Sequence, residues 1–249
     1  MKNKWKLLDV NALKIIAVVL MMLDHLLASV IPGNRWMTML GRCAFPIFAF
    51  MVAEGYVHTS DVKKYIKRLF VFALISEIPF NLFYIGAPIF PFHQNVMFTL
   101  LYGLLILYQL GKLKESDAIK SRVKCVAVIG LLLLASVITF PDYGIRGVLT
   151  VVAFYLCRYL PFTSLWQLLS LILLNIVGFK GEMLPLALGE NSFEFPLQGF
   201  AVFAILPIWL YNGTKGKKSK ILQYAFYLFY PVHMLVLWLI MRIYYLTVK

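Results

Sequence analysis

Residues Asn11–Ile31 read NALKIIAVVLMMLDHLLASVI, an apolar run that only Lys14, Asp24, His25 and a few small polar residues interrupt. A helix that spans the hydrocarbon core of a bilayer needs about 20 mostly apolar residues, so this run is long enough to cross a membrane. It is too long for a signal peptide and ends without a small-residue cleavage site. We therefore expect a retained transmembrane helix here.

The composition of the whole chain agrees with this expectation. Of its 249 residues, 61% are hydrophobic and 14% are charged, whereas soluble domains are about 45–50% apolar and about 25% charged. The net charge of +13 comes from Lys and Arg clusters between apolar runs, which is typical of an integral membrane protein. These features argue against a soluble enzyme, a disordered chain and a nucleic-acid-binding domain.

Eight further apolar runs follow the first one. The fold class is therefore predicted to be all-α, a polytopic integral membrane protein with about nine transmembrane helices in a single domain over residues 1–249. The predicted spans are Asn11–Ile31, Met37–Val57, Ile66–Ala87, Val96–Leu110, Val123–Phe140, Ile145–Leu160, Leu165–Phe179, Pro196–Tyr211 and Tyr224–Leu246. Met183–Leu188 is too short to cross and is expected to be a re-entrant or interfacial piece.

The Lys and Arg residues between the spans predict the orientation, because short cytoplasmic loops are enriched in them. With the N-terminus in the cytoplasm, the loops on that side hold Lys63, Lys64, Lys67, Arg68, Lys112, Lys114, Lys120, Arg122, Lys124, Arg158, Lys215, Lys217, Lys218 and Lys220. The opposite side holds little beyond Arg35, Arg146, Lys180 and Lys249, together with Glu182, Glu190 and Glu194. An eight-span arrangement would put one basic cluster on the wrong side. We therefore expect the N-terminus inside and the C-terminus outside.

Several polar side chains lie inside or beside the predicted spans, where a charge costs at least about 2.5–3.5 kcal/mol on insertion scales. They are Lys14, Asp24, His25, Arg42, Glu54, Glu77, His233 and Arg242, with Asn81, Asn95 and Asp142 at the outer margin. At a rise of about 1.5 Å per residue, His25 lies about 21 Å from the inner end of its span, and Arg42 lies at nearly the same level. Glu77 and His233 lie somewhat lower. We expect a polar pocket in the outer half of the bilayer.

Lys14 and His25 are eleven residues apart, about three helical turns, so they share one face of the helix at roughly 16 Å along its axis. This spacing suits a long substrate whose anionic head binds Lys14 and whose reactive end reaches His25. Adjacent helix residues do not face each other, so Asp24 is a poor partner for the His25 ring. Glu77 is the first candidate to orient that ring, and Asp24 is a candidate to pair with Arg42.

These residues also have structural interpretations, which stay open. Asp24 and Arg42 are about equally well explained as a buried ion pair that fixes helix register. His233 is explained slightly better as a core histidine bonded to a carbonyl or to Tyr230. Glu54 and Arg242 lie near helix ends and can reach water. The sequence Asp142-Tyr143-Gly144 is compatible with a turn. The three cysteines, Cys43, Cys125 and Cys157, are explained as small hydrophobic side chains in the core.

An ordered series of motifs runs along almost the whole chain. It comprises Leu13-Lys14-x-x-Ala17, Met22-x-Asp24-His25, Gly41-Arg42-x-Ala44-Phe45-Pro46-Ile47-Phe48-Ala49-Phe50, Gly55-Tyr56-x-x-Thr59, Tyr65-x-x-Arg68-Leu69, Ser76-Glu77-Ile78-Pro79-Phe80-Asn81, Asn95-x-x-Phe98-Thr99-Leu100, Asp142-Tyr143-Gly144-x-x-Gly147-Val148, Tyr211-Asn212-Gly213 and Phe229-Tyr230-Pro231-x-His233. This series resembles the TraX family of bacterial membrane proteins.

The resemblance implies an acyltransferase. The founding TraX protein is associated with N-terminal acetylation of conjugative pilin, and the family is similar to membrane acyltransferases that use cytoplasmic acyl-CoA. Those enzymes carry a basic residue, ten further residues and a catalytic histidine, a pattern that Lys14, Ile15–Asp24 and His25 match. The implied location is the bacterial cell (inner/cytoplasmic) membrane, which the chain crosses several times. The implied donor is acetyl-CoA or another acyl-CoA as co-substrate, with no metal, and the implied acceptor is extracytoplasmic: a peptide N-terminus, a cell-wall polymer or a sugar.

On this hypothesis His25 is the general base, because an imidazole can take and return a proton near neutral pH. Arg42 polarises the thioester carbonyl or balances the charge of Asp24, and Glu77 orients His25. The residues expected to bind substrate are Lys14, Asn95, Asp142, Tyr143 and His233. No G-x-S-x-G nucleophile motif is present, so direct transfer is simpler than a covalent intermediate. The alternatives are a transporter or flippase of a small anionic or lipid-linked substrate, and a non-catalytic partner of another membrane protein.

Overall fold

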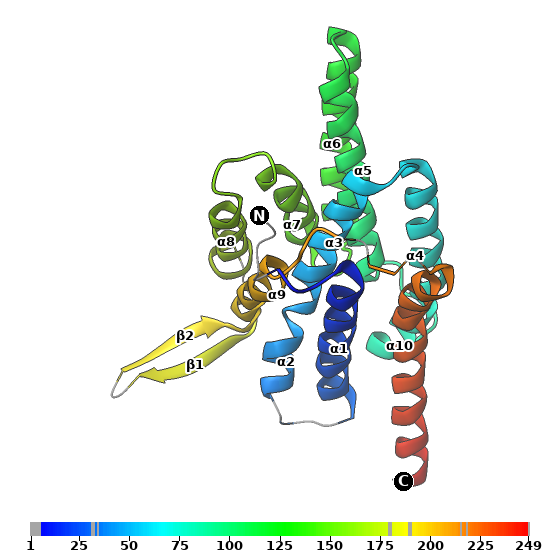
Figure 1. Cartoon of the computed structure of the whole chain (residues 1–249). Coiled ribbons are helices and arrows are strands. Elements are labelled where there is room, and N and C mark those ends of the chain that lie inside the picture. The colour runs from blue at the N-terminus through cyan, green and yellow to red at the C-terminus, as the bar shows by residue number, and fades with distance from the viewer. Residues whose placement is uncertain are drawn as a thin grey trace. The chain divides into compact units, whose positions relative to one another are not determined.

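The structure is a computed structural model that describes residues 6–30, 33, 35–178, 181–188, 191–214, 216–217 and 219–248. It is mostly helical, with one two-stranded antiparallel sheet among the described residues (Figure 1). The chain forms two compact units. Unit 1 comprises residues 1–48, 157–226 and 239–249, and unit 2 comprises residues 49–156 and 227–238. The single membrane domain stays a prediction.

Every predicted span has a helical counterpart. The elements in chain order are α1 (Val10–Ser29), α2 (Arg35–Gly41), α3 (Ala44–His58), α4 (Val62–Ile85), α5 (Val96–Glu115), α6 (Ile119–Ile138), α7 (Gly144–Cys157), α8 (Thr163–Ile172), the π-helical η1 (Leu173–Val177), β1 (Met183–Leu188), β2 (Asn191–Pro196), the 3-10 helix η2 (Leu197–Ala204), α9 (Ile205–Trp209) and α10 (Lys220–Val248). The second span differs from expectation, because a turn at Arg42 and Cys43 separates α2 from α3.

Several helices are able to cross a membrane. Within the described part of the chain, five apolar helical stretches have the necessary length: Arg35–His58, Val62–Ile85, Val96–Glu115, Ile119–Ile138 and Lys220–Thr247. Helix α1 has 20 residues, which gives it a length of about 30 Å, close to the thickness of the hydrocarbon core. Three apolar stretches are shorter: Gly144–Cys157, Thr163–Val177 and Leu197–Trp209. The count of nine spans and the cytoplasmic N-terminus stay predictions.

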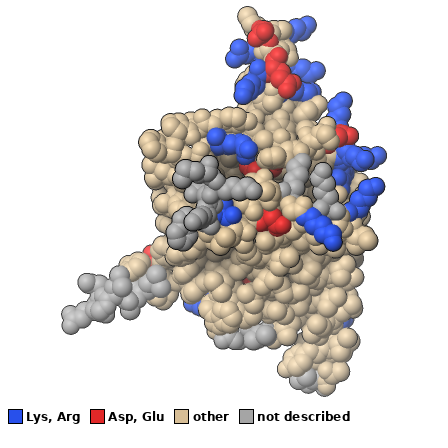
Figure 2. Space-filling view, viewed as in Figure 1, with Lys and Arg blue, Asp and Glu red and all other residues tan. Residues whose placement is uncertain are grey.

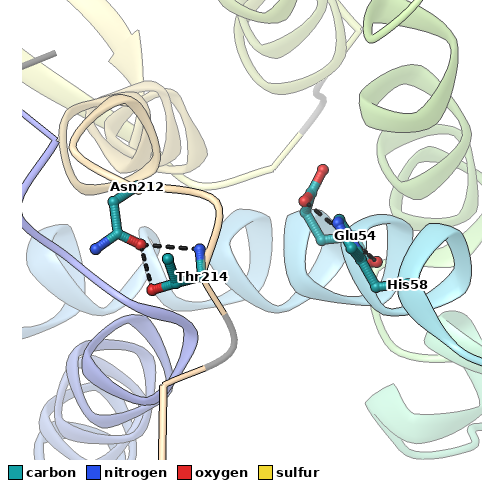
Figure 3. A network of polar contacts seen from close by, with 4 residues as sticks. All are labelled: Glu54, His58, Asn212 and Thr214. Carbon is teal, nitrogen blue, oxygen red and sulfur yellow. Dashed lines mark hydrogen bonds and ion pairs between the residues drawn. The ribbon is translucent and has the colours of Figure 1, made fainter. Parts of the chain in front are cut away.

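The start of α1 in unit 1 is fastened to the loop that follows α9. The Leu8 N–H donates to Leu210 O at 3.0 Å, and the Asn212 N–H donates to Leu8 O at 2.8 Å. Asn212 Oδ1 accepts hydrogen bonds from the backbone N–H and the hydroxyl of Thr214 at 2.9 and 2.6 Å (Figure 3). Gly213, at φ +80°, adopts a backbone conformation that favours glycine. The Tyr211-Asn212-Gly213 motif is therefore a structural turn.

Met183–Leu188, for which a re-entrant or interfacial piece is expected, is strand β1. It pairs antiparallel with β2, from Met183 opposite Pro196 to Leu188 opposite Asn191, and Figure 1 shows the hairpin projecting from the helices of unit 1. This sheet departs from the predicted all-α fold. A six-residue apolar segment is too short to bury itself as a spanning helix, and pairing with β2 satisfies its backbone hydrogen-bonding groups instead.

Unit 2 contains α4, α5 and α6 as successive antiparallel neighbours, and Figure 1 shows α5 and α6 side by side as a long pair. Because the connections are short, the beginning of α4 lies at the same end of unit 2 as the turn between α5 and α6. Figure 2 shows Lys and Arg side chains gathered at both of these places. The two basic clusters therefore lie at one end, as the predicted orientation requires of two loops on the same side of a membrane.

The core of both units is apolar. In unit 2, Leu104, Leu107, Val148 and Val151 are fully buried. The three cysteines, Cys43, Cys125 and Cys157, are also buried and unbridged. Their burial is as expected of small hydrophobic side chains, but two of them also make polar contacts. Cys43 Sγ donates to Phe200 O at 3.2 Å, and Cys157 Sγ lies 3.6 Å from Ser170 Oγ.

Candidate functional site

In unit 1, an ion pair joins α1 to the end of α2. Arg42 Nη2 lies 3.5 Å from Asp24 Oδ1, and the two side chains are 28% and 15% exposed. The Thr38 side chain on α2 is a further hydrogen-bond partner of Asp24. The structure thus brings Asp24 and Arg42 together, as proposed for a charge-balancing pair.

Gly41 permits this arrangement. A Cβ atom built on Gly41 would lie 2.4 Å from Asp24 Cβ, much closer than two carbon atoms can approach. Only glycine therefore allows α2 to pack this closely against α1 at Asp24. Arg42 follows at the turn between α2 and α3, so the Gly41-Arg42 motif combines a close helix contact with a cation presented at a helix break.

His25 and Lys14 lie on one continuous helix. Because α1 runs unbroken from Val10 to Ser29, the two residues share a face at roughly 16 Å along the axis. His25 is buried, with 8% of its surface exposed. Lys14 Nζ lies 5.2 Å from the ring centroid of Phe226, a cation–π distance. Lys14 belongs to the end of α1 that is fastened to the loop after α9, and His25 to the opposite half.

In unit 2, Glu77 and Asn95 form the centre of a second polar cluster. Glu77 Oε1 accepts a hydrogen bond from the Asn95 backbone N–H at 2.9 Å and another from its side-chain amide. The same amide donates to Ala73 O at 2.8 Å, while Asn95 Oδ1 caps α5 by accepting from the Met97 N–H at 3.0 Å. Asn81 is a further hydrogen-bond partner of Glu77. Asn95 therefore connects α4 to the start of α5.

The turn that contains Asp142 and Tyr143 is tied to the same place. The Asp142 N–H donates to Gln94 O at 2.8 Å, and the Thr99 hydroxyl donates to Asp142 O. Tyr143 has a φ of +67° and Phe140 one of +48°, which is strained for residues that have a side chain. Such strain often occurs at functional sites. Three of the predicted substrate residues, Asn95, Asp142 and Tyr143, thus gather at one end of unit 2.

The cluster has a member that the sequence analysis did not propose as a site residue. Tyr230 is 3% exposed, and its hydroxyl lies close enough to the carboxyl groups of Asp142 and Glu77 for an electrostatic interaction. The signal in the sequence is the Phe229-Tyr230-Pro231-x-His233 motif. His233 Nδ1 lies 2.7 Å from Phe229 O, and its ring stacks on the Phe229 ring at an interplanar angle of 14°. These contacts match the interpretation of His233 as a core histidine bonded to a carbonyl.

The two clusters belong to different units. Asp24, His25 and Arg42 belong to unit 1 and Glu77 to unit 2, so orientation of the His25 ring by Glu77 stays a prediction. Within unit 2, Asn95 is the residue that holds the Glu77 carboxylate.

A carboxylate–imidazole pair is found at the end of α3. Glu54 is 9% exposed, and its Oε2 lies 3.6 Å from His58 Nδ1 (Figure 3). The sequence analysis explained Glu54 as a side chain near a helix end that reaches water. In the structure Glu54 is buried instead. The spacing of four residues, which places both side chains on one helix face, is the signal for this pair.

Comparison with known proteins gives two matches. The sequence model of a family described as TraX protein matches residues 9–241. A probable fimbrial assembly protein, FimC of serogroup H1 from Dichelobacter nodosus, is 28% identical over 246 residues, which cover 90% of this chain and 92% of that protein. No solved structure matches the chain. All of the motifs from Leu13 to His233 fall within the residues that the family model matches.

Proposed function

The chain belongs to the TraX family, and from this premise we propose that it is a membrane-embedded acyltransferase. It transfers an acyl group from cytoplasmic acyl-CoA to an amine or hydroxyl on the outer side of the membrane, and acetyl is the first candidate for this group. One observation carries the proposal: α1 is unbroken, so Lys14 and His25 lie on one face at roughly 16 Å. A donor with an anionic end and a distant thioester fits this separation.

In the proposed reaction, His25 takes the proton from the acceptor N–H or O–H as the acceptor attacks the thioester carbonyl. The carbon–sulfur bond breaks, and His25 returns the proton to the departing thiolate of CoA. Arg42 stabilises the negative charge on the carbonyl oxygen, and Asp24 holds the Arg42 guanidinium in place at 3.5 Å. Burial of His25 favours transfer over hydrolysis, because bulk water is excluded.

The acceptor is proposed to enter beside the cluster in unit 2. Glu77 and Asp142 present carboxyl groups and Tyr143 a strained backbone at one end of this unit, and carboxylates accept hydrogen bonds from an amine or hydroxyl. The relative from Dichelobacter nodosus is named as a fimbrial assembly protein, which supports a peptide N-terminus as an acceptor. A cell-wall polymer and a sugar are the other candidates.

The decisive experiment is to measure CoA release from acetyl-CoA by the purified protein in detergent. Loss of a general base typically lowers the rate by about 10²–10⁴-fold, so His25→Gln is expected to reduce release by about 10²-fold or more. His58→Gln is the matched control, because His58 lies outside the proposed site, and it is expected to keep its activity. Normal CoA release by a folded His25→Gln protein would contradict the proposal.

The second candidate is a transporter of a small anionic or lipid-linked substrate. It is favoured by the break between α2 and α3 at Arg42, because discontinuous helices often form substrate sites in transporters. A protein that neither binds nor cleaves acetyl-CoA, but carries an anion into proteoliposomes in an Arg42-dependent way, would support this candidate.

A further inference from the structure

Arg68, near the start of α4, is held between two aromatic rings. Its Cζ atom lies 5.3 Å from the ring centroid of Tyr65 and 5.3 Å from that of Tyr227. The Tyr227 ring in turn stacks on Phe72, with centroids 4.9 Å apart and planes inclined at 20°. All four residues belong to unit 2. The guanidinium group is therefore fixed in position by contacts with ring faces.

Gly55 on α3 makes room for one of these rings. A Cβ atom at Gly55 would lie 3.1 Å from both Cε1 and the hydroxyl oxygen of Tyr65, so a larger residue would push the ring. Gly55, Tyr65 and Arg68 all belong to the motif series, and the proposed reaction uses none of them. The structure connects them as the parts of one clamp.

Arg68 has a hydrogen-bond donor that the described residues leave unused. Its Nε atom is buried and has no hydrogen-bond partner, and no ion pair to it is found in the described part of the chain. The nearest preceding carboxylate, Asp61, instead caps α4 by accepting from the Lys64 N–H at 2.9 Å. A buried donor without a partner is costly, which is expected where a ligand completes the site.

The surroundings favour an anion as this ligand. Lys63, Lys64 and Lys67 are exposed beside Arg68, and Figure 2 shows the Lys and Arg side chains over the beginning of α4. A guanidinium group offers N–H donors in a planar fork that matches the oxygen atoms of a phosphate. In the predicted orientation this end of α4 faces the cytoplasm.

We propose that Arg68, clamped by Tyr65 and Tyr227, binds a phosphate group at the start of α4. The phosphate can come from CoA, the donor in the proposed function, or from the head group of an anionic phospholipid. Only the first source rests on the proposed function, and the two sources are separated by experiment.

The test uses the full chain purified in uncharged detergent. Binding of CoA, and of phosphatidylglycerol added in mixed micelles, is measured for wild type, Arg68→Gln, Arg68→Lys and the neighbouring control Lys67→Gln. We expect Arg68→Gln to weaken binding of one of these ligands by about tenfold or more. Arg68→Lys keeps the charge but not the planar fork, so its affinity should lie between those of wild type and Arg68→Gln. Lys67→Gln should change the affinity less than about twofold.

A donor without phosphate separates this proposal from the proposed function. The acetyl thioester of N-acetylcysteamine carries the reactive group alone, so its turnover should be equal in wild type and Arg68→Gln. Loss of CoA affinity in Arg68→Gln assigns the phosphate to CoA, and loss of phosphatidylglycerol binding alone assigns it to lipid. Both results support a phosphate site even if no acyl transfer occurs. The proposed phosphate site would be overturned if Arg68→Gln, or the charge-conserving Arg68→Lys, bound both ligands as tightly as wild type. It would also be overturned if Lys67→Gln lost as much affinity as Arg68→Gln.

Discussion

At the residue scale, the contact between Gly41 and Asp24 gives the first prediction. Gly41→Ala would place a Cβ atom 2.4 Å from Asp24 Cβ, and neither atom can rotate away because both are attached directly to helix backbone. The two helices must separate, which stretches the 3.5 Å ion pair between Asp24 and Arg42. Overpacking of this kind typically costs about 1–3 kcal/mol. We expect a lower unfolding temperature in detergent together with reduced activity.

The matched control for this change is Gly130→Ala on α6. A Cβ atom at Gly130 meets nothing within 4 Å, and alanine is the better helix former. Gly130→Ala should therefore leave the unfolding temperature unchanged or raise it. Equal unfolding temperatures for Gly41→Ala and wild type would show that the α1–α2 contact is looser than the structure has it.

Asn95 has two structural roles that mutation can separate: it caps α5 and it donates hydrogen bonds to Glu77 and Ala73 O. Asn95→Asp keeps an oxygen that can cap α5, but it removes the amide that donates to Glu77 and to Ala73 O and places a carboxylate beside Glu77. Asn95→Ala removes both roles. We expect both variants to unfold at lower temperature than wild type, because a buried polar group that loses its partner costs about 1–3 kcal/mol. If Asn95→Asp is as stable as wild type, the cap alone explains Asn95 and the contact with Glu77 contributes nothing.

At the element scale, α5 and α7 meet at Gly103 and Val151. A Cβ atom at Gly103 would lie 2.7 Å from Val151 Cβ, so Gly103→Ala should destabilise the protein by about 1–3 kcal/mol. Val151→Gly removes Val151 Cβ and both of its methyl groups, which are the atoms that a Cβ at Gly103 would meet. The double variant should therefore lose less stability than the sum of the two single variants, as thermal or denaturant unfolding of all four proteins can measure. Simple additivity would contradict a direct contact.

The helices themselves could be predicted from the sequence, because long apolar runs suffice to identify them. The break between α2 and α3 could not, since the apolar character of Met37–Val57 continues across Arg42 and Cys43. It arises where Gly41 packs on Asp24, a contact between elements. The hairpin β1–β2 was missed for a similar reason, because Met183–Leu188 gains its strand conformation from its partner, Asn191–Pro196.

At the scale of the whole molecule, depth along the spans predicted which residues lie at one level but not which helices are neighbours. It placed Asp24 and Arg42 together, and the structure pairs them. For Glu77, the sequence analysis proposed an interaction with His25, which stays a prediction, and the structure shows that Asn95 binds the Glu77 carboxylate within unit 2. Asn95 is close because the short loop after α4 brings the start of α5 back to the end of α4, and a hydropathy pattern does not contain that information.

The predicted orientation of the whole chain can be tested by cysteine labelling. The native cysteines provide little background, because Cys43, Cys125 and Cys157 are only 7%, 5% and 4% exposed. With the N-terminus inside and every predicted span crossing, Asp117 after α5 and Tyr159 after α7 should both face the cytoplasm, since two crossings separate them.

Two further positions report the opposite side. Pro88 after α4 and Glu182 after η1 are exposed and should lie outside. A maleimide that does not cross membranes should therefore label Pro88→Cys and Glu182→Cys in spheroplasts, and Asp117→Cys and Tyr159→Cys only in inside-out vesicles. A complete reversal would overturn the orientation but keep the crossings. If Asp117→Cys and Tyr159→Cys are labelled from different sides of the membrane, either α6 or α7 does not cross it. The basic clusters then cannot all lie on one side, because their assignment to one side depends on every span crossing.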